Sequence, residues 1–488
     1  MARDETILAL SYAVRLSVVL KYLGQLALAL AALTLVPLLV ALGYQDHAFA
    51  GRLLAVVVAA GAAGAMFSRL PAPARMQVNE ALVITALAFV GSALLMTWPL
   101  MAAGIGFSAA LFEAVSAVTT TGLSTLATVE DMPPTFLFTR AWMQWYGGLG
   151  IVVLSVALLL GHSLASHRLV DPELHTENIA TTTRHYARRM LLVYVVLTLA
   201  GMFLLWLAQV DGFSAMTHVL AAVSTGGFSS FDGSLAALPP MAQVVISLLC
   251  IAGAVALPLY YALFNRGLGE MARDVELRAL LVLAAAVGVA MTWVLVLDGM
   301  PWGEAMRHGF LLGISAQTTA GFSSLDTGSV SAGGQLLLIL AMLGGGSLGS
   351  TAGGIKLLRL LILGRLVQLT LWRSRIAEHA VVQPWLGARR LEDDDIERAL
   401  LLILLFLLVI AFSWLPFVLL GYDPLDALFE VVSATGTVGL SSGISASGLP
   451  PVLQAVLCFA MLAGRVEIVA LLVLLFPGTW FGKRTEMS

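Results

Sequence analysis

Four short runs of small and hydroxyl-bearing residues recur along the chain, and each run has a glycine at the same place. A threonine lies two residues before that glycine, and a serine lies two residues after it. The runs are 119–122, 224–227, 318–321 and 436–439, and each follows a short apolar segment. A ring of backbone carbonyl oxygens can replace the hydration shell of an alkali cation. The chemistry that this pattern favours is therefore cation binding by main-chain oxygens.

The composition of the runs suits such a filter. A segment whose successive carbonyls turn toward one axis needs backbone angles that glycine adopts more readily than residues with a Cβ atom. The fourth run, Thr437-Val438-Gly439-Leu440, differs from the potassium-channel run Thr-Val-Gly-Tyr mainly at its last residue. We expect the filter to consist of Thr119, Thr120, Thr121, Gly122, Ser224, Thr225, Gly226, Gly227, Thr318, Thr319, Ala320, Gly321, Gly436, Thr437, Val438 and Gly439. We expect the bound cation to contact Thr120, Thr121, Thr225, Gly226, Thr319, Ala320, Thr437 and Val438.

A simpler explanation for any single run is that its glycine packs helices or forms a loop turn. The shared register of the four runs argues against this, because unrelated loops have no reason to match at three positions. The runs lie about 95 to 120 residues apart, which indicates one supersecondary unit for each run in a fourfold internal repeat.

Composition places these units in a membrane. Apolar residues make up 59% of the chain, charged residues make up 11%, and the mean hydropathy is +0.94. Soluble proteins contain roughly a quarter of charged residues, so we predict an all-α polytopic membrane protein. Cys250 and Cys458 both fall in apolar stretches, which supports neither a disulfide framework nor a thiolate metal site. No nucleophile, metal cluster or dinucleotide fingerprint lies at a plausible site, so we do not expect an enzyme.

The hydrophobic segments suggest how the runs are positioned. A membrane-spanning helix needs about 20 mostly apolar residues, and such segments lie at 16–42, 51–68, 79–103, 140–161, 189–210, 240–264, 278–299, 334–367, 398–420 and 452–476. A shorter apolar segment precedes each run, as at 107–118 and 424–434, and is predicted to be a re-entrant pore helix. The expected unit is helix, pore helix, filter and helix, repeated four times around one central pore.

These units divide the chain into an N-terminal two-helix extension and four pore repeats. The extension is 1–78, and the repeats are 79–165, 166–270, 271–375 and 376–488. Basic residues are concentrated in alternate connecting segments, which predicts that these segments are cytoplasmic and that all four filters open from the outside.

The expected span at 334–367 contains a glycine-rich stretch, 344–354, that does not suit a continuous helix. Each glycine costs about 1 kcal/mol relative to alanine in a helix, so we predict a broken helix. A phosphate-binding loop is one alternative, but the stretch lacks the required Gly-Lys-Ser/Thr ending. A hinge without a gating role is another. Lys356, just past the stretch, could simply extend to the inner surface.

Arg465 lies well inside the last expected span, where an ionisable side chain indicates a functional role. At about 8 Å from the pore axis, with an effective dielectric constant near 20, its charge would oppose a cation by about 2 kcal/mol. We expect this pore barrier to shape conduction. The alternative is a structural role, either in bonds to filter-side carbonyls or in a pair with Glu467, although residues two apart on a helix do not face each other.

Glu113 and Glu430 occupy matching positions in the first and fourth expected pore helices, where the other two have His218 and Leu312. The two carboxylates could attract cations to the mouth of the pore. They could instead bond backbone amides and hold the filter in shape, and we favour this structural role.

Over nearly its whole length the chain resembles the TrkH and TrkG subunits of the bacterial Trk potassium-uptake system, in the superfamily that also holds the KtrB and HKT proteins. Similar local runs are Phe-Glu-Ala-Val-Ser at 112–116, Gln-Trp-Tyr-Gly-Gly-Leu-Gly at 144–150 and Gly-Arg-Val-Glu at 464–467. The run at 349–356 is also similar, although Ala352 stands where we expect glycine or another small residue. The N-terminal helix pair is more similar to TrkH than to KtrB.

The resemblance implies potassium as the transported ion, because in this family glycine at all four filter positions accompanies potassium preference. A serine at the first position accompanies sodium permeation. The resemblance also implies an intramembrane gating loop beneath the filter, and the residues expected there are Gly344, Gly345, Gly346, Gly349, Ser350, Thr351, Gly353, Gly354 and Lys356.

The resemblance further implies a homodimer in the bacterial inner membrane, with a pore in each chain, and a cytoplasmic TrkA-like nucleotide-binding ring as regulator. Membrane lipids are further expected partners, whereas we expect no nucleic acid and no organic cofactor. The main function expected is gated, channel-like potassium uptake. A symporter coupled to protons or sodium is the alternative, and a membrane scaffold without permeation is a third possibility.

Overall fold

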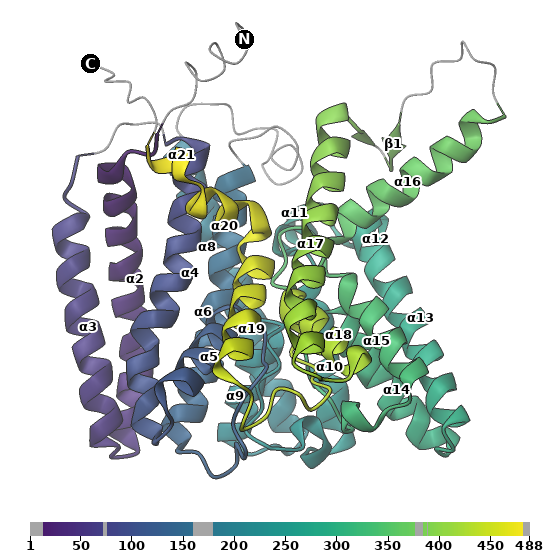
Figure 1. Ribbon diagram of the computed structural model, residues 1–488, viewed down its shortest axis with the longest axis horizontal. Helices are drawn as coiled ribbons and strands as arrows, with labels where there is room; N and C mark the ends of the chain where they lie inside the picture. Colours follow the sequence, from purple (N-terminus) through teal and green to yellow (C-terminus); the bar gives the residue numbers. More distant parts are fainter. Residues whose placement is uncertain (1–12, 72–75, 160–178, 376–383, 388, 482–488) are drawn as a thin grey trace, which may run out of the picture.

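The protein is an all-α membrane protein, as the computed structural model of residues 13–71, 76–159, 179–375, 384–387 and 389–481 shows (Figure 1). The long helices are α2 (Leu16–Gly43), α3 (His47–Phe67), α4 (Val78–Leu100), α6 (Pro134–Leu159), α8 (Ile179–Leu207), α13 (Val275–Leu297) and α17 (Asp393–Leu419). In the described part of the chain, the strands are β1 (Trp385–Leu386) and β2 (Arg389–Arg390), which form an antiparallel pair. Small helical elements are α12 (Leu268–Arg273), α21 (Pro477–Trp480), η1 (Met101–Ala103), η2 (Ser234–Ala237) and η3 (Thr327–Ser329).

Four short helices end where the four filter runs begin. They are α5 (Phe107–Val118), α9 (Gly212–Val223), α14 (Trp302–Gln317) and α18 (Pro424–Thr435). All four lie in the half of the molecule opposite to α21 and β1 (Figure 1). Helices of 12 to 16 residues are too short to cross a bilayer, so their carboxyl ends, and the runs that follow, lie inside the apolar layer.

Three of the helices that follow the runs are interrupted. The first interruption separates α10 (Pro240–Ala254) from α11 (Leu257–Arg266), and the second separates α15 (Ala332–Leu343) from α16 (Leu357–Arg373). The third lies between α19 (Pro451–Arg465) and α20 (Glu467–Leu475), whose axes differ by 116°. The glycine-rich stretch predicts the second interruption, and Pro258 lies in the first turn of α11, directly after the first interruption.

Helices occupy all of the expected spans within the described residues. Six of these helices are long and apolar enough to cross a membrane alone, and the count is seven if α19 and α20 form one span. The remaining expected spans are filled by interrupted or less apolar helices. A multi-pass membrane protein is therefore confirmed.

The N-terminal helices α2 and α3 contact each other through two glycines. A Cβ atom on Gly64 would come within 2.8 Å of the carbonyl oxygen of Gly24, and a Cβ atom on Gly24 would come within 2.7 Å of the amide nitrogen of Ser68. Such close approach of two backbones is typical of small residues in membrane helix pairs.

We expect Gly64→Val to lower the free energy of unfolding by about 1–3 kcal/mol, because the added methyl groups force the two helices apart. Gly61→Val is the matched control, since it introduces the same residue into α3 at a position with no atom within 4 Å. Thermal unfolding in detergent compares the two variants. Equal unfolding temperatures for the two variants would contradict the close contact between α2 and α3.

Candidate functional site

The four runs share one backbone conformation. The threonine two residues before each glycine has a left-handed φ of 49° to 54° (Thr120, Thr225, Thr319 and Thr437). The glycines have φ of 74° to 100° (Gly122, Gly227, Gly321 and Gly439), and the residue between has a negative φ. A left-handed threonine costs about 1–3 kcal/mol, and such strain concentrates at functional sites. Its recurrence at all four matched positions indicates a geometry that the function requires.

The runs meet in a closed ring, in which each glycine lies against a carbonyl oxygen of the next run. A Cβ atom on Gly122 would overlap the oxygen of Gly226, and the equivalent overlaps are Gly227 with Ala320, Gly321 with Val438, and Gly439 with Thr121. The contacts run from the first run to the fourth and return to the first. The structure therefore brings the predicted filter residues together around one centre, with no room for side chains at the four glycines.

Each run is tied to its own pore helix by the same hydrogen bond. The residue before the glycine donates its N–H group to the carbonyl five residues earlier, at 2.7 to 2.9 Å (Thr121 to Ser116, Gly226 to Ala221, Ala320 to Ser315, and Val438 to Ser433). In the first and fourth runs the glycine N–H also donates to a serine hydroxyl, Ser116 or Ser433, at 3.0 Å. These bonds hold the run directly at the carboxyl end of the helix.

The second run is held differently. Ala221 has no hydroxyl to offer, and the side chain of Gln144 in α6 bonds the run instead. Its Oε1 atom accepts from the N–H group of Phe228 at 3.2 Å, and its Nε2 atom donates to the carbonyl oxygen of Gly226. One of the oxygens expected to contact the ion is thus already hydrogen-bonded to the protein.

Beyond each glycine, a polar side chain of the pore helix holds the outgoing segment. The serine after the filter bonds the residue 11 positions earlier in three repeats: Ser124 with Glu113 at 2.6 Å, Ser229 with His218 at 2.9 Å, and Ser441 with Glu430 at 3.0 Å. In the third repeat that earlier position is Leu312. His308, one helical turn before it, bonds Ser324 instead, at 2.7 Å. All four ionisable side chains are buried, and each bonds the segment that follows its run.

Arg140 is an important residue that the sequence analysis missed. Its guanidinium group lies 2.7 Å from the carboxylate of Glu113, and both side chains are at most 1% exposed. It also donates to the carbonyl oxygen of Ser229 at 3.3 Å and lies over the ring of Phe228 at 4.2 Å. Arg140 therefore connects the first pore helix to the segment that leaves the second run. The sequence does mark Arg140 as unusual, because it is a basic residue in a segment that is expected to lie on the outer side of the membrane.

The predicted gating-loop residues 344–356 form the connection between α15 and α16. The loop contacts three runs: the N–H group of Gly353 donates to the Thr319 hydroxyl at 2.7 Å, that of Gly354 donates to the Gly436 carbonyl at 2.9 Å, and Thr225 and Thr351 share a bond of 3.3 Å. A Cβ atom on Gly353 would overlap the backbone of Gly436. The loop thus packs directly against the runs, and it contacts two of them at their threonine side chains.

Arg465 lies next to this loop. Its Nη1 atom donates to the carbonyl oxygen of Thr351 at 2.6 Å, and its side chain is 3% exposed. Lys356 donates to the carbonyl oxygen of Ala352, one residue further along the loop. Both cations therefore bind carbonyl oxygens of the loop.

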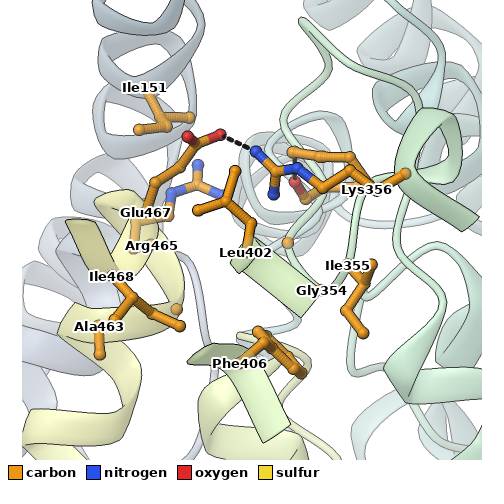
Figure 2. A pocket seen from close by; sticks show the side chains of 14 residues that line it. Ile151, Gly354, Ile355, Lys356, Leu402, Phe406, Ala463, Arg465, Glu467 and Ile468 are labelled. Carbon is orange, nitrogen blue, oxygen red and sulfur yellow. Dashed lines mark hydrogen bonds and ion pairs between the residues drawn. The ribbon is translucent and has the colours of Figure 1, made fainter. Parts of the chain in front are cut away.

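Lys356, Arg465 and Glu467 line one small pocket of about 30 Å³ (Figure 2). Glu467 does not pair with Arg465, because the chain bends between α19 and α20. It instead forms an ion pair of 2.8 Å with Arg359 of α16, drawn as a dashed line in Figure 2. The broken helices α16 and α20 are thus joined beside the loop.

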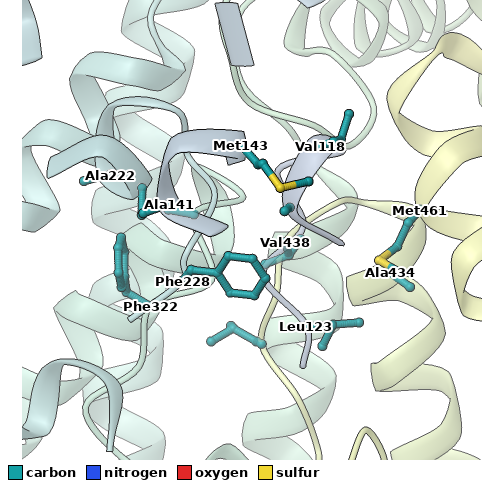
Figure 3. Close-up of a cluster of buried hydrophobic side chains, with 14 of the residues drawn as sticks. Val118, Leu123, Ala141, Met143, Ala222, Phe228, Phe322, Ala434, Val438 and Met461 are labelled. Atoms are coloured by element: carbon teal, nitrogen blue, oxygen red, sulfur yellow. The ribbon is translucent and has the colours of Figure 1, made fainter. Parts of the chain in front are cut away.

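The bulky residue after each filter glycine anchors the ring in the core. Leu123, Phe228, Phe322 and Leu440 are each at most 4% exposed. Figure 3 shows Phe228 and Phe322 among apolar side chains from several helices, including Met143, Ala222 and Met461. A packed shell of this kind keeps the ring at a fixed diameter, because protein interiors resist changes of volume.

The family of the chain follows from comparison with known proteins. The model of the TrkH family, described as cation transport proteins, matches residues 52–478. The chain belongs to the TrkH family. The resemblance drawn from the filter runs is thereby confirmed.

Individual TrkH-family relatives cover most of the chain. It is 31% identical to the Trk system potassium uptake protein TrkH of Escherichia coli over 76% of this chain and 79% of that one. It is 30% identical to TrkI of Halomonas elongata over 95% and 96% of the two chains. The crystal structure of the potassium transporter TrkH from Vibrio parahaemolyticus matches with a TM-score of 0.84 and 26% identity, over 96% of this chain and all of the other.

Proposed function

We propose that this TrkH-family protein takes up potassium through a gated, channel-like pore. The observation that carries the proposal is the closed ring of four runs, each with a left-handed threonine and glycine and each in contact with the next. Such a ring places main-chain oxygens from four sides around one centre, as a site for a dehydrated alkali cation requires. The names of the relatives from Escherichia coli and Halomonas elongata, both potassium uptake proteins, support potassium as the ion.

We assign the ion contacts to the backbone oxygens of the runs. Those of Thr121, Ala320 and Val438 lie at the junctions between runs, and we expect them to face the ion together with Thr120, Thr225, Thr319 and Thr437. The oxygen of Gly226 also lies at a junction, but its bond to Gln144 weakens its contribution. Potassium is the cargo, and we propose no organic cofactor and no enzymatic activity.

The gate in this proposal is the loop between α15 and α16. It contacts three runs through Gly353, Gly354 and Thr351, and Arg465 binds the loop from α19. Conduction therefore requires that the loop move away from the runs. The basic charge of Arg465 would also oppose a cation that passes the loop.

We further propose the assembly that the resemblance implies: a homodimer in a bacterial inner membrane, with one pore in each chain and a TrkA-like nucleotide-binding ring on the cytoplasmic side. The repeat boundaries 79–165, 166–270, 271–375 and 376–488 belong to the same proposal, with 1–78 as an extension. Two inner connections could contact such a regulator, and parts of them, 160–178 and 376–383, lie outside the described residues.

Ion-coupled symport is the second candidate function, and current recordings separate the two. We expect single-channel current steps in planar bilayers, with a reversal potential that follows the potassium gradient and ignores imposed proton or sodium gradients. A symporter would instead shift its reversal potential with the coupled ion, by an amount set by a fixed stoichiometry. A shift of that kind would contradict the channel proposal.

A further inference from the structure

Two buried carboxylates lie behind the filter, and only one of them is neutralised. Glu113 pairs with the buried guanidinium group of Arg140 at 2.7 Å. Glu430 is fully buried in the matching position of the fourth repeat, and none of the ion pairs between described residues includes it. The first repeat therefore adds no net charge near the ring, whereas the fourth adds one carboxylate.

Burial disfavours the charged form of Glu430, and the hydrogen bonds around the carboxylate oppose that effect. Its Oε2 atom accepts from the backbone N–H group of Ser442 at 2.9 Å, and its Oε1 atom accepts from that of Ser445 at 3.2 Å. The Ser441 hydroxyl donates to the same carboxylate at 3.0 Å. A backbone N–H group can only donate, so each carboxylate oxygen faces a donor, and such bonds stabilise a negative charge.

Glu430 holds the segment that leaves the ring after Gly439, on the side where we propose that the ion enters. The segment that it holds, 441–445, begins two residues after Gly439, which itself lies against the carbonyl oxygen of Thr121 in the ring. The carboxylate is screened from water by protein, so dissolved salt reduces its field much less than that of a surface charge.

We propose that Glu430 is the charge that concentrates potassium at the outer mouth of the filter, while the Glu113–Arg140 pair is an electrically neutral support. Glu430 is a positioning residue that does not itself contact the ion. Its field raises cation occupancy at the mouth and its hydrogen bonds hold the segment after Gly439. The inference rests on the proposed filter function.

The test is potassium uptake into liposomes by the purified full-length protein over a range of external potassium concentrations. We expect Glu430→Gln to raise the half-saturating concentration about 15-fold, the effect of one charge at an effective dielectric constant near 20 and a distance of about 10 Å. The maximal flux should change much less. Glu430→Asp keeps the charge and alters the geometry, so it should stay within about threefold of the parent.

Two controls separate charge from structure. The double variant Glu113→Gln/Arg140→Gln removes a buried pair without changing net charge, so its half-saturating concentration should stay near that of the parent even where its maximal flux falls. Asp423→Asn removes an exposed acid at the start of α18 and retains an acceptor for the N–H groups of Leu425 and Asp426. Its effect should vanish at physiological salt, whereas that of Glu430→Gln should persist.

The possible outcomes discriminate between the two proposals. If Glu430→Gln, Glu430→Asp and the double variant all change the half-saturating concentration alike, or if Glu430→Gln leaves it unchanged, the inference about Glu430 is wrong. If the parent protein shows no saturable potassium flux, the proposed function fails first. Both proposals are supported if the parent shows potassium-selective flux and only the Glu430→Gln variant has a raised half-saturating concentration.

Discussion

Gly122→Ser is expected to reduce the ratio of potassium to sodium flux by about tenfold or more. A Cβ atom at this position would overlap the carbonyl oxygen of Gly226, so the first two runs must separate. Serine would also have to adopt the φ of 92° that glycine holds here. Overpacking of this kind costs about 1–3 kcal/mol, and a tenfold change in selectivity corresponds to about 1.4 kcal/mol. A wider ring coordinates a dehydrated potassium ion less closely, so it discriminates less between potassium and sodium.

Fluxes of both ions into liposomes measure this effect. Gly443→Ser is the matched control, because Gly443 also has a left-handed φ, of 96°, but has no atom within 4 Å of an added Cβ. The control should bear similar backbone strain and keep the potassium preference of the parent. Loss of selectivity in both variants, or in neither, would contradict the role of close packing in the ring.

Arg465→Gln is expected to raise the potassium flux, by up to about thirtyfold. Two effects act in the same direction. The variant removes a charge that opposes a cation by about 2 kcal/mol at a distance of about 8 Å and an effective dielectric constant near 20. It also removes the charged hydrogen bond of 2.6 Å that holds Thr351 of the gating loop.

Arg465→Lys distinguishes the two effects, since it keeps the charge but lacks the planar guanidinium group that reaches both Thr351 and Gly147. An increase in Arg465→Gln alone assigns the barrier to charge, and an increase in both variants assigns it to the bond with the loop. Potassium flux at fixed membrane potential is the measurement. Unchanged or lower flux in Arg465→Gln, with the protein folded, would contradict a barrier role.

The four runs that form the ring could be located from sequence because they share a local pattern that is repeated four times. Thr120 and Gly122, with their equivalents, must adopt unusual backbone angles, and only a few residue types tolerate the close contacts of the ring. The glycine-rich break at 344–354 was predictable for the same reason, since glycine is unfavourable in a helix. Family membership and the all-α membrane fold followed from these features and from hydropathy.

The supporting side chains were harder to predict because they act between segments that are distant in sequence. Arg140 meets Glu113 from another helix, Gln144 reaches a run 82 residues away, and His308 takes the place of Leu312 from one helical turn earlier. The bend after Arg465 lies inside a segment that hydropathy predicts as one continuous span, so Glu467 could not be matched with Arg359, which is 108 residues away. Each of these contacts depends on tertiary packing, which cannot be read from hydropathy or from the spacing of residues.

The most direct test of the central claim is a crystal structure of the protein soaked with thallium or rubidium, recorded at an energy where the ion scatters anomalously. The account predicts an anomalous peak at the centre of the ring, within coordination distance of main-chain oxygens from all four runs. A structure with the ion bound elsewhere, or with no peak between Thr121, Gly226, Ala320 and Val438, would contradict it.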